Sequence, residues 1–357
     1  MADLTPGHLH GLRVAVTGAS GNVGTALLRR LTDPALGIAE VRGIARRQPP
    51  DTAPYSGVDW HLLDLGEQSG AADLRRAFAG VDAVVHLAWA LQPGRHPEQL
   101  AAVNVEGTDR VAQAAARAGV GHVVHMSSLG AYAAGAGAQA VGEDWPVTGI
   151  PSSQYSRDKS AAERVVRQVL GSRAGTTLTV VRPTLVLQPE AASEIGRYFL
   201  GPLFFAAARA LPGAVARALP LPLPALRVGF VHADDVADGL VRILDRRAPG
   251  AFNLAAEPAF DAPGLARTLG SRRIPVPAAV LRAGLTAAHA AHLVPTEPGW
   301  LDLGVGAPAL DTTRARTLLD WTPAHAGGDV LREFVAALGR GEGAPGPLLR
   351  PASGRAG

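Results

Sequence analysis

The sequence predicts an α/β protein with a doubly wound parallel sheet and a smaller lobe interleaved towards its C-terminus. Short apolar runs alternate with amphipathic helical segments through the first half, and a glycine-rich turn joins the first run to the first helix. The alternation breaks after Pro183. This rhythm is typical of βαβ units, whose helices cover both faces of a parallel sheet.

Each element is expected from its own pattern. Short apolar runs predict strands at Arg13–Thr17, Val41–Ala45, Val81–Leu87, Val120–Met126 and Leu178–Arg182. Apolar residues at helical spacing predict helices at Asn22–Leu31, Leu74–Ala79, Leu100–Ala118 and Tyr155–Leu170. After a Pro- and Ala-rich stretch, one strand and one helix return over Val228–Leu244. We therefore predict a sheet domain of residues 10–188 and 228–254, a second lobe of residues 189–227 and 255–340, and a disordered tail at 341–357.

The composition excludes several classes of protein. The 42 glycines and 28 prolines among 357 residues have no fixed period, which rules out collagen and coiled coils. Without cysteine there are no disulfides or thiolate sites, and no metal site is expected. The 34 basic and 31 acidic residues are spread along the chain, which argues against nucleic-acid binding. The first 13 residues do not resemble a signal peptide, and Arg209, Arg217 and prolines break the apolar stretch 198–228, so we expect a cytoplasmic protein with no membrane segment.

The glycine-rich turn predicts a dinucleotide site. It has the spacing GxxGxxG and consists of Thr17, Gly18, Ala19, Ser20, Gly21, Asn22, Val23 and Gly24. Glycines let backbone N–H groups at a helix N-terminus approach phosphate oxygens closely. A plain strand-to-helix turn would read similarly, but the position directly after a strand favours the cofactor.

The end of the second expected strand favours NADP(H), with NAD(H) as the other possibility. A ribose 2′-hydroxyl is usually held by an acidic residue, whereas a 2′-phosphate needs cations. Ala45 stands where the carboxylate would be expected, and Arg46 and Arg47 follow it. The alternative is that both arginines are simply solvated. Asp64 and Leu65, after the next strand-like segment, are candidates for the adenine amino group.

A tyrosine and a lysine four residues apart predict acid–base chemistry. Tyr155 and Lys159 share one helix face, and a cation near a phenol favours its ionised form. Lys159 is the only lysine among the 34 basic residues, which sets it apart from an incidental surface cation. Ser128 leaves an apolar strand at the sheet edge where ligands bind, so its hydroxyl is a candidate partner for a substrate carbonyl.

In these features the chain resembles the extended short-chain dehydrogenase/reductase superfamily, of the epimerase/dehydratase type. The resemblance runs from Thr17 to about Pro323 and adds His86-Leu87-Ala88, Asn104-Val105-Glu106-Gly107-Thr108, Arg182-Pro183 and Val231-His232-Ala233-Asp234-Asp235 to the residues above. It implies a Rossmann fold in which Ser128 polarises a carbonyl, Tyr155 passes a proton, and Lys159 holds the nicotinamide ribose and lowers the tyrosine pKa. It also implies a cofactor site that includes Leu87, Ala88, Trp89, Asn104, Pro183 and Thr184.

Departures from the family pattern narrow the expected chemistry. Sugar-nucleotide dehydratases carry an Asp-Glu pair where this chain has Leu129 and Gly130, so that route of dehydration is not expected. Epimerases typically have asparagine where this chain has Leu185. The Pro-Thr-Leu-Val stretch from Pro183 and the arginine at position 46 are more similar to dihydroflavonol and cinnamoyl-CoA reductases.

The sequence therefore predicts an NADP(H)-dependent oxidoreductase acting on a carbonyl or alcohol of a small, fairly apolar molecule. An apolar second lobe suggests a pocket that includes Trp89, Leu185, Arg197, Tyr198 and Trp300, although these residues would equally suit a core or a dimer surface. An NAD-dependent sugar or sugar-nucleotide epimerase is the alternative, and a catalytically silent nucleotide sensor is a third hypothesis. Helices Leu100–Ala118 and Tyr155–Leu170 often pair in dimers of this superfamily, so we expect a homodimer.

Overall fold

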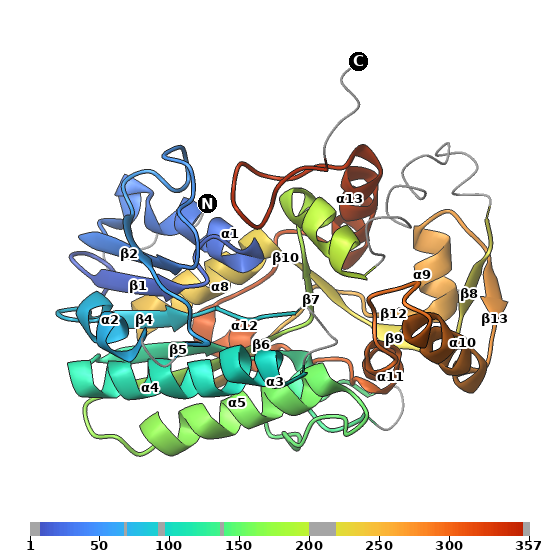
Figure 1. Ribbon diagram of the computed structural model, residues 1–357, viewed down its shortest axis with the longest axis horizontal. Helices are drawn as coiled ribbons and strands as arrows, with labels where there is room; N and C mark the ends of the chain where they lie inside the picture. Colours follow the sequence, from blue (N-terminus) through green and yellow to red (C-terminus); the bar gives the residue numbers. More distant parts are fainter. Residues whose placement is uncertain (1–7, 68–69, 92–96, 136–138, 200–218, 353–357) are drawn as a thin grey trace.

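A parallel sheet of seven strands forms the centre of the molecule (Figure 1). The computed structural model describes residues 8–67, 70–91, 97–135, 139–199 and 219–352. The strand order is β11-β6-β5-β4-β1-β2-β3, and every neighbouring pair is parallel. The strands are β1 (Arg13–Thr17), β2 (Glu40–Ala45), β3 (Asp59–Leu62), β4 (Ala83–His86), β5 (His122–Met126), β6 (Thr177–Pro183) and β11 (Gly250–Leu254). The direction of winding reverses between β1 and β4, which creates a crevice at the carboxyl ends of these strands.

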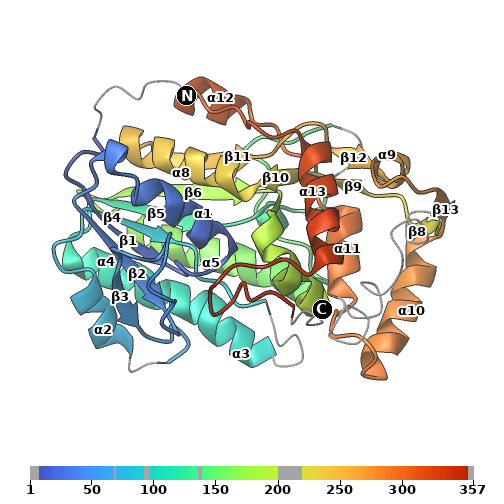
Figure 2. The ribbon, with the colours of Figure 1, turned by 90° about the horizontal axis from the view of Figure 1, so that it is seen from above.

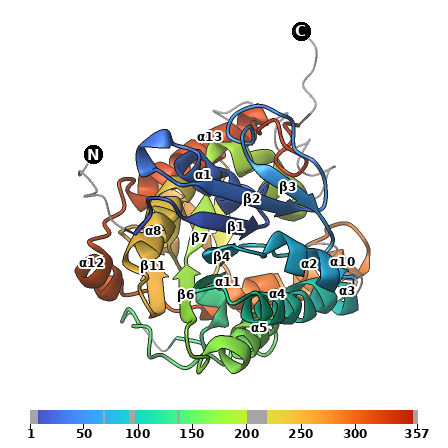
Figure 3. The same cartoon turned by 90° about the vertical axis from the view of Figure 1, so that its left-hand side faces the viewer.

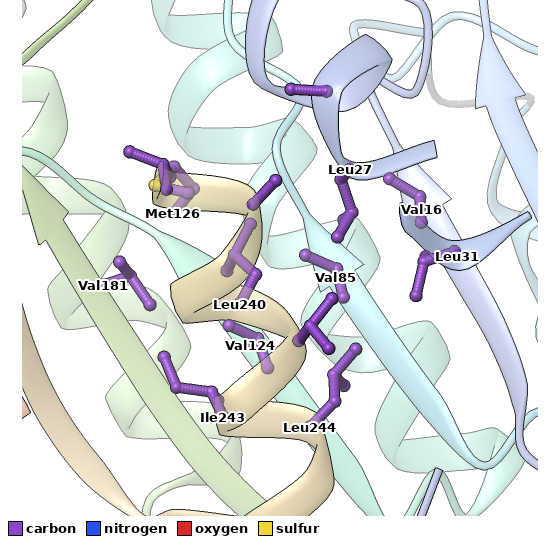
Figure 4. Packing of buried hydrophobic residues seen from close by; sticks show 14 of the residues in the cluster. Val16, Leu27, Leu31, Val85, Val124, Met126, Val181, Leu240, Ile243 and Leu244 are labelled. Carbon is purple, nitrogen blue, oxygen red and sulfur yellow. The ribbon is translucent and has the colours of Figure 1, made fainter. Parts of the chain in front are cut away.

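Helices cover both faces of the sheet, as Figure 3 shows. On one face, α1 (Asn22–Leu31) and α8 (Ala233–Arg246) bury leucines against strand valines. Figure 4 shows Leu27 and Leu240 in this layer, near Val85 and Val124. The other face is covered by α2 (Gly70–Ala77), α4 (Gly107–Ala118) and α5 (Gln154–Leu170). The predicted doubly wound fold is confirmed.

The expected helix over Leu100–Ala118 is divided into three parts. It consists of α3 (Pro97–Ala101), a π-helical turn (Ala102–Glu106) and α4. Inside the π turn, the side chain of Asn104 accepts a hydrogen bond from the Ala90 backbone N–H at 2.7 Å and donates one to the Ala90 carbonyl at 2.9 Å. The wider turn therefore accompanies a connection to the loop after β4, which a local hydrophobic pattern cannot reveal.

The second lobe is interleaved with the sheet domain. β8 (Leu221–Leu223) pairs with β13 (Arg273–Pro275), and β9 (Arg227–Val228) pairs with β12 (Phe260–Asp261), so segments on either side of α8 lie together. This lobe also contains α9 (Ala262–Thr268), α10 (Ala278–Ala290) and α11 (Gly299–Gly306), grouped at the right of Figure 1. The remaining elements are β7 (Leu185–Leu187), β10 (Phe230–His232), α12 (Thr313–Leu319), α13 (Gly327–Arg340) and the 3₁₀ turns Pro34–Leu36, Leu129–Ala131 and Pro189–Ala191.

The expectation of a disordered tail is wrong for residues 341–352. Leu349 is fully buried, and Ala344 packs with it against Ala191. The backbone N–H of Ala344 also donates to the Leu349 carbonyl at 2.7 Å. The abundance of Gly and Pro here builds tight turns instead of preventing order. Residues 353–357 lie outside the described part of the chain.

Candidate active site

The glycine turn at the end of β1 forms a backbone cradle that leaves no room for side chains. Gly18 has a φ of +69°, and a Cβ there would lie 2.7 Å from the Ala88 backbone. A Cβ on Gly24 would lie 2.3 Å from the carbonyl oxygen of Gly18. Gly21 is the N-cap of α1, so the first N–H groups of this ten-residue helix face the turn. This cradle fits the phosphates of a dinucleotide.

A groove leads from this cradle along the carboxyl edge of the sheet. Its walls contain eight of the predicted cofactor residues, namely Gly18, Ser20, Arg46, Arg47, Asp64, Leu65, Ala88 and Trp89. Arg46 and Arg47 are exposed at its end, and the Asp64 carboxylate is held by the Gly66 backbone N–H at 2.8 Å. Cations and a carboxylate at these positions suit the 2′-phosphate and the adenine of a bound nucleotide.

Other predicted cofactor residues support the groove from behind. The Thr17 hydroxyl lies 2.6 Å from Nδ1 of His86, and Val23 and Leu87 pack against the core. Asn22 donates from its side chain to the Val186 carbonyl at 2.9 Å, which ties α1 to β7. Pro183 ends β6 and Thr184 follows it. Within the described residues, the buried Thr184 hydroxyl has no hydrogen-bond partner, so it is available to a ligand.

Ser128, Tyr155 and Lys159 come together beside the groove. Ser128 follows β5 and accepts a hydrogen bond from the Gly130 backbone N–H at 3.0 Å, and its hydroxyl lies near the phenol of Tyr155, whose pKa it lowers. Tyr155 and Lys159 lie one turn apart on α5. A Cβ on Gly130 would lie 2.8 Å from the Tyr155 ring. Gly130 stands at a position where dehydratases carry an acidic residue. A side chain at this position would clash with the Tyr155 ring.

Burial dominates the pKa values of both groups on α5. Burial raises the pKa of Tyr155 to about 12, against a smaller lowering by the nearby Ser128 hydroxyl. Burial also lowers the pKa of Lys159 to about 7, against the opposing effect of the Glu163 carboxylate. The structure thus differs from the expectation that Lys159 lowers the tyrosine pKa. Its ammonium lies 5.9 Å from the Tyr155 ring centroid, and burial outweighs any such effect.

The ammonium of Lys159 has two close neighbours. It donates to the Met126 carbonyl at 3.0 Å and lies 3.5 Å from the centroid of the Trp89 ring. Both contacts stabilise a cation in a buried place. Trp89 therefore contacts Lys159 and also lines the groove.

A buried ionic network lies beneath the trio and was not predicted. Arg182 pairs with Glu163 through two hydrogen bonds and donates to the Tyr132 hydroxyl at 2.7 Å. The Tyr132 hydroxyl in turn donates to Asn253 at 2.7 Å. Glu163 also accepts a hydrogen bond from Ser127, next to Ser128. A glutamate four residues after Lys159 was a visible signal, but its partners are far apart in sequence.

Aromatic rings form the wall on the far side of Tyr155. The Trp300 ring centroid lies 4.7 Å from that of Tyr155 and 4.9 Å from that of Phe199. Trp89 approaches Tyr155 edge-on at 5.9 Å. A small pocket here is lined by Ala90, Leu91, Leu100, Asn104, Tyr155, Asp158, Glu297 and Trp300. Of the predicted pocket residues, Trp300 lines this pocket, and Trp89 contacts Tyr155 beside it.

Three other predicted pocket residues lie elsewhere. Arg197 donates to the carbonyls of Leu348 and Arg350, and the Tyr198 hydroxyl donates to Glu194 at 3.0 Å. Leu185 is on β7, 41% exposed, and pairs with Phe230. Arg197 and Tyr198 belong to helical residues 192–199, and their polar groups make these contacts instead of lining the small pocket beside Tyr155. Glu297 belongs to the run Thr296–Trp300, which the sequence suggests as part of the pocket, whereas Asp158 was missed although it stands between Tyr155 and Lys159.

Two further findings concern the described part of the chain. It contains no group of three or more His, Asp or Glu side chains arranged to hold a metal ion. None of the helices it contains is long and apolar enough to cross a membrane.

The sheet, the cradle at its switch point and the Ser–Tyr–Lys set together define an extended short-chain dehydrogenase/reductase. The chain belongs to the NAD-dependent epimerase/dehydratase family, whose profile matches residues 14–255. Members of this superfamily are NAD(P)-dependent enzymes. The resemblance inferred from the sequence is confirmed.

The chain is similar in sequence to proteins of several other organisms. Sterol demethylase protein B of Methylococcus capsulatus is 36% identical over 178 residues, which cover 49% of this chain and 51% of that protein. Cinnamoyl-CoA reductase 1 of Oryza sativa is 28% identical over 258 residues, 65% of this chain and 68% of that protein. An uncharacterized Mycobacterium tuberculosis protein, Rv2047c, is 28% identical over 92% of this chain, which spans only 30% of its length.

Solved structures share the fold at low identity. The UDP-glucose 4-epimerase of Thermus thermophilus, in complex with NAD, has a TM-score of 0.66 and 20% identity over 92% of this chain and 99% of its own. DesIV, a dTDP-glucose 4,6-dehydratase from Streptomyces venezuelae, has a TM-score of 0.66 and 22% identity over 91% and 96%.

Proposed function

We propose that the protein is an NADP(H)-dependent oxidoreductase that interconverts a carbonyl and an alcohol on a small, largely apolar molecule. The observation that carries this proposal is that Ser128 and Tyr155 lie side by side, with the Ser128 hydroxyl oxygen 3.5 Å and the Tyr155 ring 2.8 Å from the Cβ position of Gly130. This pair stands between the nucleotide groove and an aromatic wall. The nicotinamide, when bound, supplies or accepts a hydride. A carbonyl beside it needs a hydrogen-bond donor and a proton source, and this pair provides both.

Each member of the trio has a distinct part in this reaction. The Ser128 hydroxyl donates to the substrate oxygen as negative charge develops there. Tyr155 gives its phenol proton to the same oxygen in the direction of reduction, and its raised pKa keeps it protonated at neutral pH. Lys159, held by the Met126 carbonyl, presents its ammonium to the nicotinamide ribose.

The preference for NADP(H) is supported by the end of the groove. Arg46 and Arg47 line it directly after Ala45, and no carboxylate stands at that strand end to hold a ribose hydroxyl. Arginine recognises phosphate through a planar fork of donors. NAD(H) is the cofactor that the alternative epimerase function would use.

The class of substrate is supported by the pocket and by the relatives. Trp89, Trp300 and Phe199 offer flat apolar surfaces near the acid–base pair. The names of relatives refer to sterols, a farnesyl quinoline and cinnamoyl-CoA. We extend to this chain only their common feature, a carbonyl or alcohol on a bulky apolar group.

A cytoplasmic location stays a prediction from the sequence.

The test is a fluorescence titration with NADPH and with NADH, after any co-purified nucleotide has been identified. We expect tighter binding of NADPH in the unmodified protein. Arg46→Ala should weaken NADPH binding by about tenfold and leave NADH binding nearly unchanged, because only NADPH presents the 2′-phosphate. Arg246→Ala, at the exposed end of α8, is the matched control. Tightly retained NAD, or equal effects on both nucleotides, would favour the epimerase instead.

A further inference from the structure

Residues 342–350, here named the strap, run from the end of α13 back towards the sheet domain (Figures 1 and 2). Gly341 ends α13 with a φ of +70°, which reverses the direction of the chain. Within the strap, the backbone N–H of Ala344 donates to the Leu349 carbonyl at 2.7 Å, and that of Gly346 donates to the Ala344 carbonyl at 2.7 Å. The strap is therefore a folded loop with its own backbone hydrogen bonds.

The strap is anchored to the segment that follows β7. The Leu349 side chain is fully buried and packs with Ala191. The Arg197 guanidinium donates to the Arg350 carbonyl at 3.0 Å and to the Leu348 carbonyl at 3.4 Å. The Ser193 backbone N–H donates to the Glu342 carbonyl at 3.1 Å. Several independent contacts thus hold one side of the strap.

The strap also reaches the opposite side, near the loop after β2. A Cβ on Gly346 would lie 2.8 Å from the Tyr55 hydroxyl, so the strap backbone rests directly on this ring. Tyr55 is buried, and its hydroxyl lies 3.0 Å from that of Thr25 on α1. With contacts to Tyr55 on one side and Arg197 on the other, the strap bridges two parts of the chain.

Between its anchors the strap forms a wall of the nucleotide groove. Pro347 and Leu348 line the groove together with Gly18, Ser20 and Arg46. The Leu348 Cδ1 lies 4.0 Å from the Cβ position of Gly21, the N-cap of α1. An apolar side chain therefore faces the backbone cradle.

We propose that the strap is part of the cofactor site, and that Pro347 and Leu348 cover the bound dinucleotide and slow its release. The apolar contacts exclude water from the phosphates, which strengthens their attraction to the helix N-terminus. Because the strap is already folded, closing it over the ligand costs little ordering entropy. The inference goes beyond the proposed reaction, since it holds for NADPH and NADH alike.

The experiment compares two strap variants with two matched controls. Leu348→Ser removes the apolar contact with the groove, and Arg197→Ala releases the anchor without changing any side chain that lines the groove. The controls are Leu318→Ser, an exposed leucine of α12, and Arg332→Ala, an exposed arginine of α13. For each protein we would measure the equilibrium dissociation constant of NADPH and NADH, the release rate by stopped flow, and urea unfolding without nucleotide.

The expected result is release about five times faster in both strap variants and unchanged release in both controls. Release at the unmodified rate, or tighter binding in the strap variants, would overturn the inference, because the strap would then be a bystander or an obstruction. If the protein prefers NADH, the proposed choice of NADP(H) fails while the strap is still tested with NADH. If Leu348→Ser does not fold, Arg197→Ala alone decides.

Discussion

At the scale of single residues, burial determines the pKa values of Tyr155 and Lys159. The Tyr155 phenol is enclosed by Trp89, Trp300 and Gly130, and this burial raises its pKa to about 12. A phenol with this pKa is protonated at neutral pH and suited to donate a proton to an oxyanion. Burial lowers the pKa of Lys159 to about 7, so a larger fraction of this side chain is uncharged at neutral pH than in an exposed lysine. Without nucleotide, the site therefore holds this phenol in its protonated form.

Removal of the phenol should separate binding from chemistry. For Tyr155→Phe we expect turnover to fall by about a hundredfold to ten-thousandfold, because the proton donor is lost. Nucleotide affinity should stay within about twofold, since the groove itself is unchanged. Tyr198→Phe is the matched control, because it removes a phenol hydroxyl that donates to Glu194. Steady-state kinetics and nucleotide titration measure both effects, and full activity in Tyr155→Phe would refute the mechanism.

At the scale of secondary-structure elements, local sequence patterns predicted the helices and strands that depend mainly on local interactions. Strands β1, β2, β4, β5 and β6 and helix α1 follow from apolar runs and the glycine turn, and the Tyr155–Lys159 spacing places both groups on one helix face. The π turn at Asn104 could not be predicted in this way, because it accompanies contacts with Ala90. The contacts of Arg197 with the Leu348 and Arg350 carbonyls could not be predicted for a similar reason, since these residues are about 150 positions apart in the chain.

Because α1 packs closely on the glycine turn, adding one methyl group at Gly24 should strongly reduce both stability and nucleotide binding. In Gly24→Ala the new Cβ would meet the Gly18 and Ala19 carbonyls at 2.3 and 2.6 Å. We expect a loss of about 1–3 kcal/mol in the free energy of unfolding, together with loss of nucleotide binding, because the turn must open. Urea unfolding and nucleotide titration measure these losses.

Another helical glycine provides the control for this substitution. Gly284 lies in α10, and a Cβ there would have no heavy atom within 4 Å. Gly284→Ala should therefore be neutral or stabilise by about 0.5–1 kcal/mol. Equal effects at the two positions would mean that close packing at the turn does not limit nucleotide binding.

At the scale of the whole molecule, the two lobes and the strap surround one sheet edge. The strap was missed from the sequence because its Gly and Pro content resembles that of disordered tails, while its anchors at Tyr55 and Arg197 are distant in the chain. The sheet domain was predictable because its contacts repeat regularly. Substrate and cofactor sites depend on what the second lobe and the strap add to it.

The sequence also predicts a homodimer, for which α4 and α5 are the expected contact surface. Gln113 on α4 and the small Ala161 on α5 are both half-buried and so partly open to a partner. Light scattering after size exclusion should give twice the mass of one chain, and Ala161→Arg should shift it towards one chain by obstructing close helix packing. Ala287→Arg on exposed α10 is the control. A monomeric unmodified protein would contradict this prediction.

Acid stability should depend on histidines buried in the centre of the sheet. Burial lowers the pKa of His86 to about 3 and that of His122 to about 4, and it holds the pKa of His125 well below its usual range. Because these side chains take up protons near pH 6.5 only when the chain unfolds, stability is lost as the pH falls below that value. Each histidine should contribute a loss of about 2 kcal/mol between pH 6.5 and 5. Buried carboxyls with raised pKa values, such as Glu143 and Glu194, act in the opposite sense, so variants must be compared with the unmodified protein.

His125 offers the clearest test, because neither of its ring nitrogens has a hydrogen-bond partner among the described residues. His125→Leu removes the titrating group without breaking such a bond, so its stability at pH 7 should be kept or improved. Between pH 6.5 and 5 the variant should lose about 2 kcal/mol less than the unmodified protein, measured by urea unfolding at each pH. His10→Leu makes the same substitution at an exposed position and is the control. If both variants follow the unmodified protein, the buried histidines are not what makes the fold sensitive to acid.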